Sequence, residues 1–133
     1  MKFASTRLIT DDVQRLVDFY ELVTEQRFER PNPAFAELVT AGAGSLAIGS
    51  SQTLPLFAGT GLTAAANTSA IIEFQVHDVD AHRARIGERA EVVQEPITLP
   101  WGNRAFMLVD PDGNHVNLYE PFTDEARARF ADR

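Results

Sequence analysis

Six polar side chains that could bind or react with a small molecule lie in three short stretches where polar residues alternate with apolar ones. They are Ser5, Arg7, Glu73, Gln75, Asn117 and Tyr119. Because successive side chains of a β-strand point to opposite faces, each stretch would present its polar members on one face if it were extended. Hydroxyl, guanidinium, carboxylate and amide groups on a shared surface are suited to bind a small molecule, and Glu73 is a weak candidate for a general base.

Arg7 and Glu73 occupy corresponding places in two similar stretches, and the sequence leaves three roles open for them. They could pair with each other as ions. Alternatively, Arg7 could hold an anionic group of a ligand with its planar guanidinium, or Glu73 could act as a general base. A neighbouring arginine favours the ionised carboxylate and so weakens it as a base, which makes the ion pair the favoured interpretation.

The histidines and one acidic turn invite a metal interpretation that their spacing does not support. His77 and His82 are five positions apart across the start of a predicted helix, which is a poor spacing for chelation. The turn "DPDGN" begins like a calcium loop, but Pro111 and Gly113 suit a tight hairpin, and Pro121 stands where such a loop would supply its glutamate. We therefore interpret the histidines as solvated residues and the turn as a hairpin.

The single tryptophan, Trp101, lies in a loop because "LPWGNRAF" places it between a proline and a glycine. A loop tryptophan either covers the core or offers a surface on which a ligand stacks, and the sequence leaves both roles open. Asn103 and Arg104 could belong to the same site or be exposed residues at the entry of a strand. The second interpretation of Asn103 and Arg104 is favoured.

Composition excludes several classes of function. The chain has 133 residues, 44% of them hydrophobic, which is enough for one domain with a buried core. A net charge of −7 argues against nucleic acid as a partner, and no apolar run is long enough to cross a membrane. The N-terminus lacks the apolar run of a secretory signal, and the absence of cysteine excludes thiolate metal sites. We expect a cytoplasmic protein whose partner is a small molecule or another protein.

The elements that would carry the polar residues occur twice along the chain. A strand over "FASTRLIT" precedes an amphipathic helix through Val13 and Tyr20, which Asp11 or Asp12 can cap. The same order recurs at "IIEFQV", where Asp78 begins the matching helix. "LVTAGAGSLAI" aligns without gaps on "LVDPDGNHVNL", each as strand, turn and strand. A repeat at half length indicates two copies of one βαβββ unit.

The repeat divides one domain, residues 1–133, into segments. These are a first βαβββ module over 1–50, a crossover over 51–68, a second βαβββ module over 69–121 and a C-terminal helix over 122–133. A crossover of this length is unusual in a compact domain, so we expect Leu54–Phe57 to form a short strand or the edge of a lid. Thr123 and Asp124 are the N-cap candidates of the last helix.

Three segments give the chain a family resemblance. "LITDDVQRLVDFYE", "IIEFQVHDVDAHRARI" and "PWGNRAFMLVDPDGNHVNLYEP" resemble the glyoxalase/bleomycin-resistance/dioxygenase superfamily, also called vicinal oxygen chelate proteins. The resemblance implies an α+β fold in which two βαβββ modules form a curved, barrel-like cup of mixed β-sheet with helices outside. It also implies a homodimer. It names no reaction, because this fold hosts metal-dependent isomerases, dioxygenases and thiol transferases beside metal-free binding proteins.

The resemblance also identifies where a metal would bind. In metal-dependent members, the first and last strand of each module supply the ligands, which are typically His, Gln or Glu. The corresponding residues of this chain are Ser5, Ala47, Ile71 and Asn117. They offer no imidazole and no carboxylate, and Ile71 cannot bind a metal. The resemblance therefore implies that the usual metal site is absent and that no cofactor is needed, with a divalent metal as the alternative.

Strand alternation predicts the lining of the cup. The residues expected to face it are Ser5, Arg7, Ile71, Glu73, Gln75, His77, His115, Asn117 and Tyr119, with Trp101 and Phe57 at its edges. The residues expected on the helix side are Thr6, Leu8, Ile72, Phe74, Val76, Val116 and Leu118.

These residues and the resemblance together predict a metal-free protein that binds a small molecule in the cup, as resistance proteins sequester drugs. The expected ligand-binding residues are Arg7, Glu73, Gln75, Trp101, Asn117 and Tyr119, and the acidic charge balance favours a cationic ligand. One alternative is a lyase, isomerase or dioxygenase-type enzyme that uses a metal or acid–base chemistry of Glu73 and Arg7. Another is a non-catalytic regulatory or structural dimer whose cup is filled by its own side chains.

Overall fold

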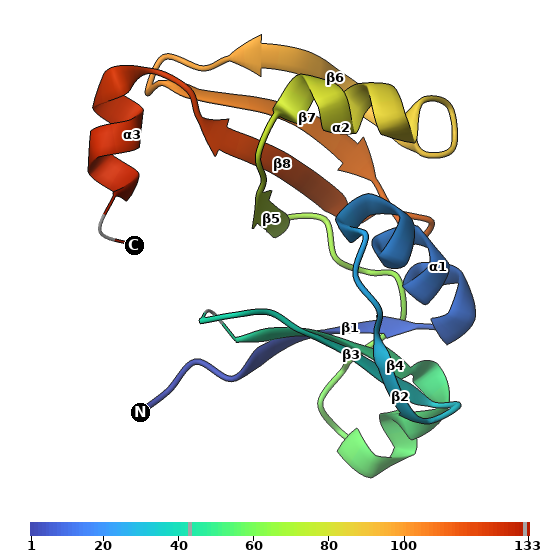
Figure 1. Ribbon diagram of the computed structural model, residues 1–133. Helices are drawn as coiled ribbons and strands as arrows, with labels where there is room; N and C mark the ends of the chain where they lie inside the picture. The colour runs from blue at the N-terminus through green and yellow to red at the C-terminus, as the bar shows by residue number, and fades with distance from the viewer. Residues whose placement is uncertain (43, 132) are drawn as a thin grey trace. The chain divides into compact units, whose positions relative to one another are not determined.

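A computed structural model describes residues 1–42, 44–131 and 133. By their internal contacts these residues form two compact units, Met1–Asn67 and Thr68–Arg133, which we describe separately. Each unit contains one βαβββ module with a four-stranded mixed sheet (Figure 1). The prediction of an α+β fold built from two βαβββ modules is confirmed. Among the described residues, no helix has the length and apolar character needed to span a membrane.

The first unit contains four strands, one α-helix and one 3-10 helix. They are β1 (Ser5–Thr10), α1 (Val13–Thr24), β2 (Glu29–Asn32), β3 (Phe35–Val39), β4 (Ser45–Ser50) and η1 (Ser51–Phe57). The strand order is β1-β4-β3-β2, with β1 parallel to β4 and the other neighbours antiparallel.

Helix α1 begins at a cap that the sequence provides. The Asp12 side chain accepts a hydrogen bond from the backbone N–H of Arg15 at 3.1 Å, which satisfies one of the free donors of the first turn. Its apolar stripe is buried, with Leu16, Tyr20 and Val23 fully inaccessible. The helix ends at Glu25, whose φ of 56° lies in the left-handed region. The stripe thus fixes α1 against one face of its sheet.

The second unit repeats this order and adds a C-terminal helix. Its elements are β5 (Ile71–Gln75), α2 (Val79–Ile86), β6 (Glu91–Thr98), β7 (Asn103–Val109), β8 (His115–Pro121) and α3 (Asp124–Phe130). The strand order is β5-β8-β7-β6, again with one parallel pair, between β5 and β8. The largest fully buried side chains of this unit come from α2 and the facing side of the sheet: Val79, Ile86, Phe106, Leu108, Val116 and Leu118.

Strand register confirms the gap-free alignment of the two hairpins. Leu38 pairs with Leu46 in the first unit, and the aligned residue Leu108 pairs with Val116 in the second. Residue 43, in the first of these turns, lies outside the described residues. The register also aligns the parallel pairs, because Arg7 lies opposite Ala47 and Glu73 lies opposite Asn117. Arg7 and Glu73 are therefore equivalent positions of the repeat.

The acidic turn between β7 and β8 is a hairpin, as predicted. Asp110 is buried and its carboxylate accepts hydrogen bonds from the backbone N–H groups of Asp112 and Asn114, both at 2.9 Å. The side-chain amide of Asn114 donates to the same carboxylate at 2.8 Å. Gly113 has a φ of 86°, a conformation that disfavours residues with a Cβ. The aspartate of this turn thus organises the backbone.

Three expectations about the elements need correction or completion. The segment Leu54–Phe57 is part of the 3-10 helix η1 and not a strand. Ser50 caps η1 by accepting from the backbone N–H of Gln52, and Pro55 has no N–H to contribute to a sheet. Thr6 was expected against the helix but is exposed. Thr123 caps α3, and residue 132 of the predicted C-terminal helix lies outside the described residues.

Candidate functional site

Polar side chains gather on one face of the second unit's sheet, opposite the buried side that packs on α2. We call it the polar face and define it by the residues that strand pairing aligns there: Ile71, Glu73, Gln75, Met107, His115, Asn117 and Tyr119. Ile71, Glu73 and Gln75 are exposed, whereas the intervening Ile72 and Phe74 are half-buried. The burial pattern of β5 therefore follows the alternation predicted from the sequence, whereas in β8 Asn117 is buried together with its neighbours Val116 and Leu118.

Glu73 and Asn117 form the centre of the polar face. They lie opposite each other on the parallel strands β5 and β8, and the Asn117 side-chain N–H donates to the Glu73 carboxylate at 2.9 Å. Asn117 is only 8% exposed, so burial restricts its side chain, and its amide holds the more exposed Glu73 carboxylate in one position. Asn117, at a position that the family resemblance assigns to a metal ligand, therefore orients the Glu73 carboxylate instead.

Tyr119 continues the polar face along β8, opposite Gln75. Its ring lies against Phe130 of α3, with 5.8 Å between ring centroids. Burial raises the pKa of the Tyr119 phenol above its ordinary value of 10.0, the negative charge of Glu73 raises it further, and Arg133 opposes the rise. At neutral pH the phenol is therefore protonated and has a hydrogen to donate.

The loop that contains Trp101 is hydrogen-bonded to α3 and to the residues just before it. The Trp101 carbonyl accepts from the Arg129 guanidinium at 2.8 Å, and the Gly102 carbonyl accepts from the backbone N–H groups of Phe122 and Thr123, both at 3.0 Å. The Trp101 side chain is 57% exposed, so it does not cover the core of this unit. Of its two possible roles, stacking on a ligand stays a prediction.

The two residues after this loop have different surroundings. Arg104 binds the Asp80 carboxylate with two N–H groups, at 2.7 and 2.8 Å, and this hydrogen bonding lowers the pKa of Asp80. Asn103 is 9% exposed, and the prediction that it is an exposed strand-entry residue is wrong. The reason is that it follows Gly102, which packs under Thr123 and Ala126 of the C-terminal segment. Its side-chain oxygen is buried without a hydrogen-bond partner among the described residues.

In the first unit, the Arg7 side chain extends from β1 toward Phe35 of β3 in the same sheet. Its guanidinium carbon is 5.2 Å from the centre of the Phe35 ring, within the range of a cation–π contact. Gly49 makes room for this path, because a Cβ there would lie 3.3 Å from the Arg7 Cδ atom. Ser5 and Phe57, also expected near the site, are exposed in this unit. A pair between Arg7 and Glu73 would join the two units and stays a prediction.

The four positions that the family resemblance assigns to metal ligands do not suit a metal in this chain. Ala47 is 1% exposed and has no donor atom, and Ile71 has none either. Asn117 already donates to Glu73, and Ser5 would contribute only a hydroxyl. Within residues 1–42, 44–131 and 133, no group of three or more His, Cys, Asp or Glu side chains could hold a metal ion. This set of donors does not suit a divalent cation.

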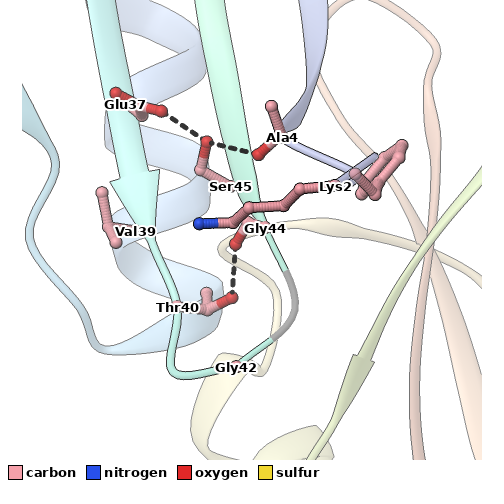
Figure 2. A pocket seen from close by; sticks show the side chains of 9 residues that line it. Lys2, Ala4, Glu37, Val39, Thr40, Gly42, Gly44 and Ser45 are labelled. Atoms are coloured by element: carbon pink, nitrogen blue, oxygen red, sulfur yellow. Dashed lines mark hydrogen bonds between the residues drawn. The ribbon is translucent and has the colours of Figure 1, made fainter.

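A cavity that the sequence did not predict lies in the first unit, between the N-terminal arm and the β3–β4 turn (Figure 2). Its volume is about 660 Å³. It is lined by Lys2, Phe3, Ala4, Glu37, Val39, Thr40, Gly42, Gly44 and Ser45. The Ser45 hydroxyl donates to the Glu37 carboxylate inside it. The apolar lining residues Phe3 and Val39 are 67% and 58% exposed. None of the predicted ligand-binding residues lines this cavity.

Residues 2–118 match the Glyoxalase/Bleomycin resistance protein/Dioxygenase superfamily. A glyoxalase/bleomycin resistance protein/dioxygenase family enzyme from Burkholderia phytofirmans PsJN has a TM-score of 0.78 at 19% identity, covering 92% of this chain and all (100%) of its own. A glyoxalase-related enzyme from Fulvimarina pelagi has a TM-score of 0.77 at 19% identity, covering 90% of this chain and 88% of its own.

A superfamily member from Sphaerobacter thermophilus DSM 20745 has a TM-score of 0.64 at 26% identity, covering 90% of this chain and 97% of its own. The comparison with curated proteins finds no match. The two structures at 19% identity show the fold alone, whereas the family match extends over most of the sequence. The resemblance predicted from the sequence is thereby confirmed. This chain belongs to the glyoxalase/bleomycin resistance protein/dioxygenase superfamily.

Proposed function

We propose that this protein binds a small organic molecule on the polar face and does so without a resident metal ion. The observation that carries the proposal is the hydrogen bond from Asn117 to Glu73. It fixes the orientation of the Glu73 carboxylate on the polar face before a ligand binds. Polar groups that are fixed before a ligand arrives lose little entropy on binding, and they determine its orientation. Binding without turnover suits a sequestration or resistance role.

The absence of suitable metal ligands supports the metal-free part of the proposal. Two of the four positions are aliphatic, and the amide at the third, Asn117, donates its hydrogen to a carboxylate. A divalent ion needs several oxygen or imidazole ligands at short range, and Ser5 is the only other contributor. The polar face therefore offers direct hydrogen bonds to a ligand rather than coordination.

We propose further that the protein is a homodimer, in keeping with the large apolar side chains on its surface. In the second unit, Val93, Ile97 and Phe122 are each at least 44% exposed and lie outside the polar face. Burying apolar surface drives association of subunits. Light scattering on the purified protein tests the stoichiometry, and a monomer at all concentrations would contradict it.

The decisive experiment locates the ligand by two matched substitutions. A thermal-shift screen of small organic molecules first identifies ligands that raise the melting temperature. Ile71→Arg and Val39→Arg then each add an arginine in place of an exposed aliphatic residue, the first on the polar face and the second at the cavity of the first unit. We expect Ile71→Arg to abolish the shift and Val39→Arg to preserve it.

The reverse pattern would assign the ligand to the cavity and overturn the proposal. Elemental analysis tests the metal-free part with the same preparation. Protein dialysed against zinc, manganese and ferrous iron, and then against buffer, should hold no stoichiometric metal. A retained equivalent of metal would contradict this part of the proposal, and it would favour the metal-dependent enzyme as the alternative.

A further inference from the structure

We propose that the ligand of the polar face presents a nitrogen cation with at least two N–H donors, such as an amidinium or guanidinium, to Glu73 and Asn117. This inference rests on the proposed function, because it names the class of ligand that the same face selects. It follows from the acceptor atoms of Glu73 and Asn117 that remain available after these two residues have formed their hydrogen bond with each other.

The hydrogen bond between Asn117 and Glu73 determines which atoms are available. Because the Asn117 nitrogen donates to one carboxylate oxygen of Glu73, its amide oxygen is left as an acceptor. The second carboxylate oxygen of Glu73 is an acceptor too. Neither oxygen accepts a hydrogen bond within the part of the chain that the structure describes. Each of the two hydrogen-bonded residues at the centre of the polar face thus keeps one acceptor oxygen that a ligand could satisfy with donors.

A cation satisfies this pair better than a neutral or anionic group. A planar N–C–N group donates two roughly parallel N–H bonds, as arginine does to carboxylates, and one of these would be charge-assisted. Charge-assisted hydrogen bonds are roughly twice as strong as neutral ones. An anionic ligand would instead meet the Glu73 carboxylate and be repelled.

Basic side chains of the second unit already have other partners. Arg104 binds Asp80, Arg83 binds Glu95 and Arg129 binds the Trp101 carbonyl. Arg133 lies over the Phe130 ring, with 5.0 Å between its guanidinium carbon and the ring centre. None of the described residues of this unit gives Glu73 a salt bridge. Its carboxylate is therefore available to a cation from outside the unit.

The surroundings of the two acceptors suit an apolar body attached to the cation. Met107 lies opposite Asn117 on the neighbouring strand β7, and Ile71, two positions before Glu73, is 53% exposed. Tyr119, two positions after Asn117, contributes an aromatic ring that can also interact with a cation. An amphipathic molecule with a flat cationic head and an apolar body matches this combination.

Three probes of nearly identical shape test the charge requirement: benzamidine, benzamide and benzoate. Their dissociation constants are measured by NMR titration at pH 8. We expect benzamidine to bind at least about tenfold more tightly than benzamide, and benzoate to bind least. Glu73→Gln should weaken benzamidine by about tenfold or more and leave benzamide within about twofold.

The control variant is Glu88→Gln, which removes the same charge from an exposed position of the same unit. It should leave the benzamidine affinity unchanged. A loss of affinity in Glu73→Gln alone would then show that Glu73 contacts the ligand and that the change in net charge is not the cause. Equal affinities of benzamidine and benzamide, both abolished by Ile71→Arg, would overturn the cation inference and keep the proposed function. If no probe binds and no small molecule shifts the melting temperature, both fall.

Discussion

Gly102 lies against Thr123 so closely that a Cβ on Gly102 would be 2.2 Å from the Thr123 hydroxyl oxygen. The Gly102 carbonyl also accepts the backbone N–H of Thr123 at 3.0 Å. This contact holds the Trp101 loop to the N-terminus of α3. Since α3 also places Phe130 on Tyr119, the contact at Gly102 helps to define one end of the polar face.

We therefore expect Gly102→Ala to destabilise the protein by more than the backbone strain alone. Both Gly102 and Gly113 have positive φ angles, 94° and 86°, but nothing lies within 4 Å of a Cβ at Gly113. Gly113→Ala should cost about 1 kcal/mol of unfolding free energy, and Gly102→Ala about 2–4 kcal/mol, because steric overlap adds to the strain. Urea denaturation measures both. Equal losses would show that the Thr123 contact relaxes freely.

The stability of the second unit should respond to acid through Asp80. Its folded pKa lies below the ordinary 3.8 because Arg104 donates hydrogen bonds to it. A lowered carboxyl pKa contributes stability that is present above the unfolded pKa and is lost as the pH falls through the folded pKa. We expect Asp80→Asn to flatten the fall in unfolding free energy below about pH 4. Denaturation curves between pH 5 and pH 2 measure this, with Glu88→Gln as the comparison.

Tyr119 should titrate above the ordinary range of a phenol. Burial and the charge of Glu73 both raise its pKa above 10.0. Because a folded phenol with a raised pKa resists ionisation, its contribution to stability is lost only as the pH rises above the unfolded value. Absorbance titration of wild type and Tyr119→Phe isolates its signal from that of the buried Tyr20. Glu73→Gln should lower the pKa of Tyr119 while burial keeps it above 10.0.

Asn117→Asp should create the metal affinity that the native residues do not support. The substitution replaces the donor to Glu73 with a second carboxylate, so two like charges would face each other. We expect a loss of about 1–3 kcal/mol in unfolding free energy at pH 7, partly restored by millimolar manganese. Manganese should leave the wild type unchanged. If it stabilises both proteins equally, Asn117 does not control metal binding.

The sequence predicted the fold because its signals are local and occur twice. Alternation in "IIEFQV", the cap at Asp12 and the Asp110 turn each specify an element by short-range chemistry, and each is found as expected. The polar face follows from the same alternation. The bond between Glu73 and Asn117 could not be predicted, because the register of strands far apart in sequence is set by packing.

Three other features were not predicted from the sequence. Asn103 is buried because the chain returns over Gly102 some twenty residues later. The apolar stretch Leu54–Phe57 is compatible with a strand or a helix, and only its Ser50 cap and Pro55 separate the two. The cavity of Figure 2 depends on the path of the N-terminal arm, for which no periodicity gives a signal.

The equivalence of Arg7 and Glu73 in the repeat has a consequence for stoichiometry. Both follow the same register, yet one copy of the module carries a positive charge where the other carries a negative one. Ala47 also stands where the second copy has Asn117. A molecule attracted to the second copy would be repelled at the matching place in the first. The chain therefore contains two copies of the module but a single binding site for such a molecule. Titration should saturate at one ligand per chain.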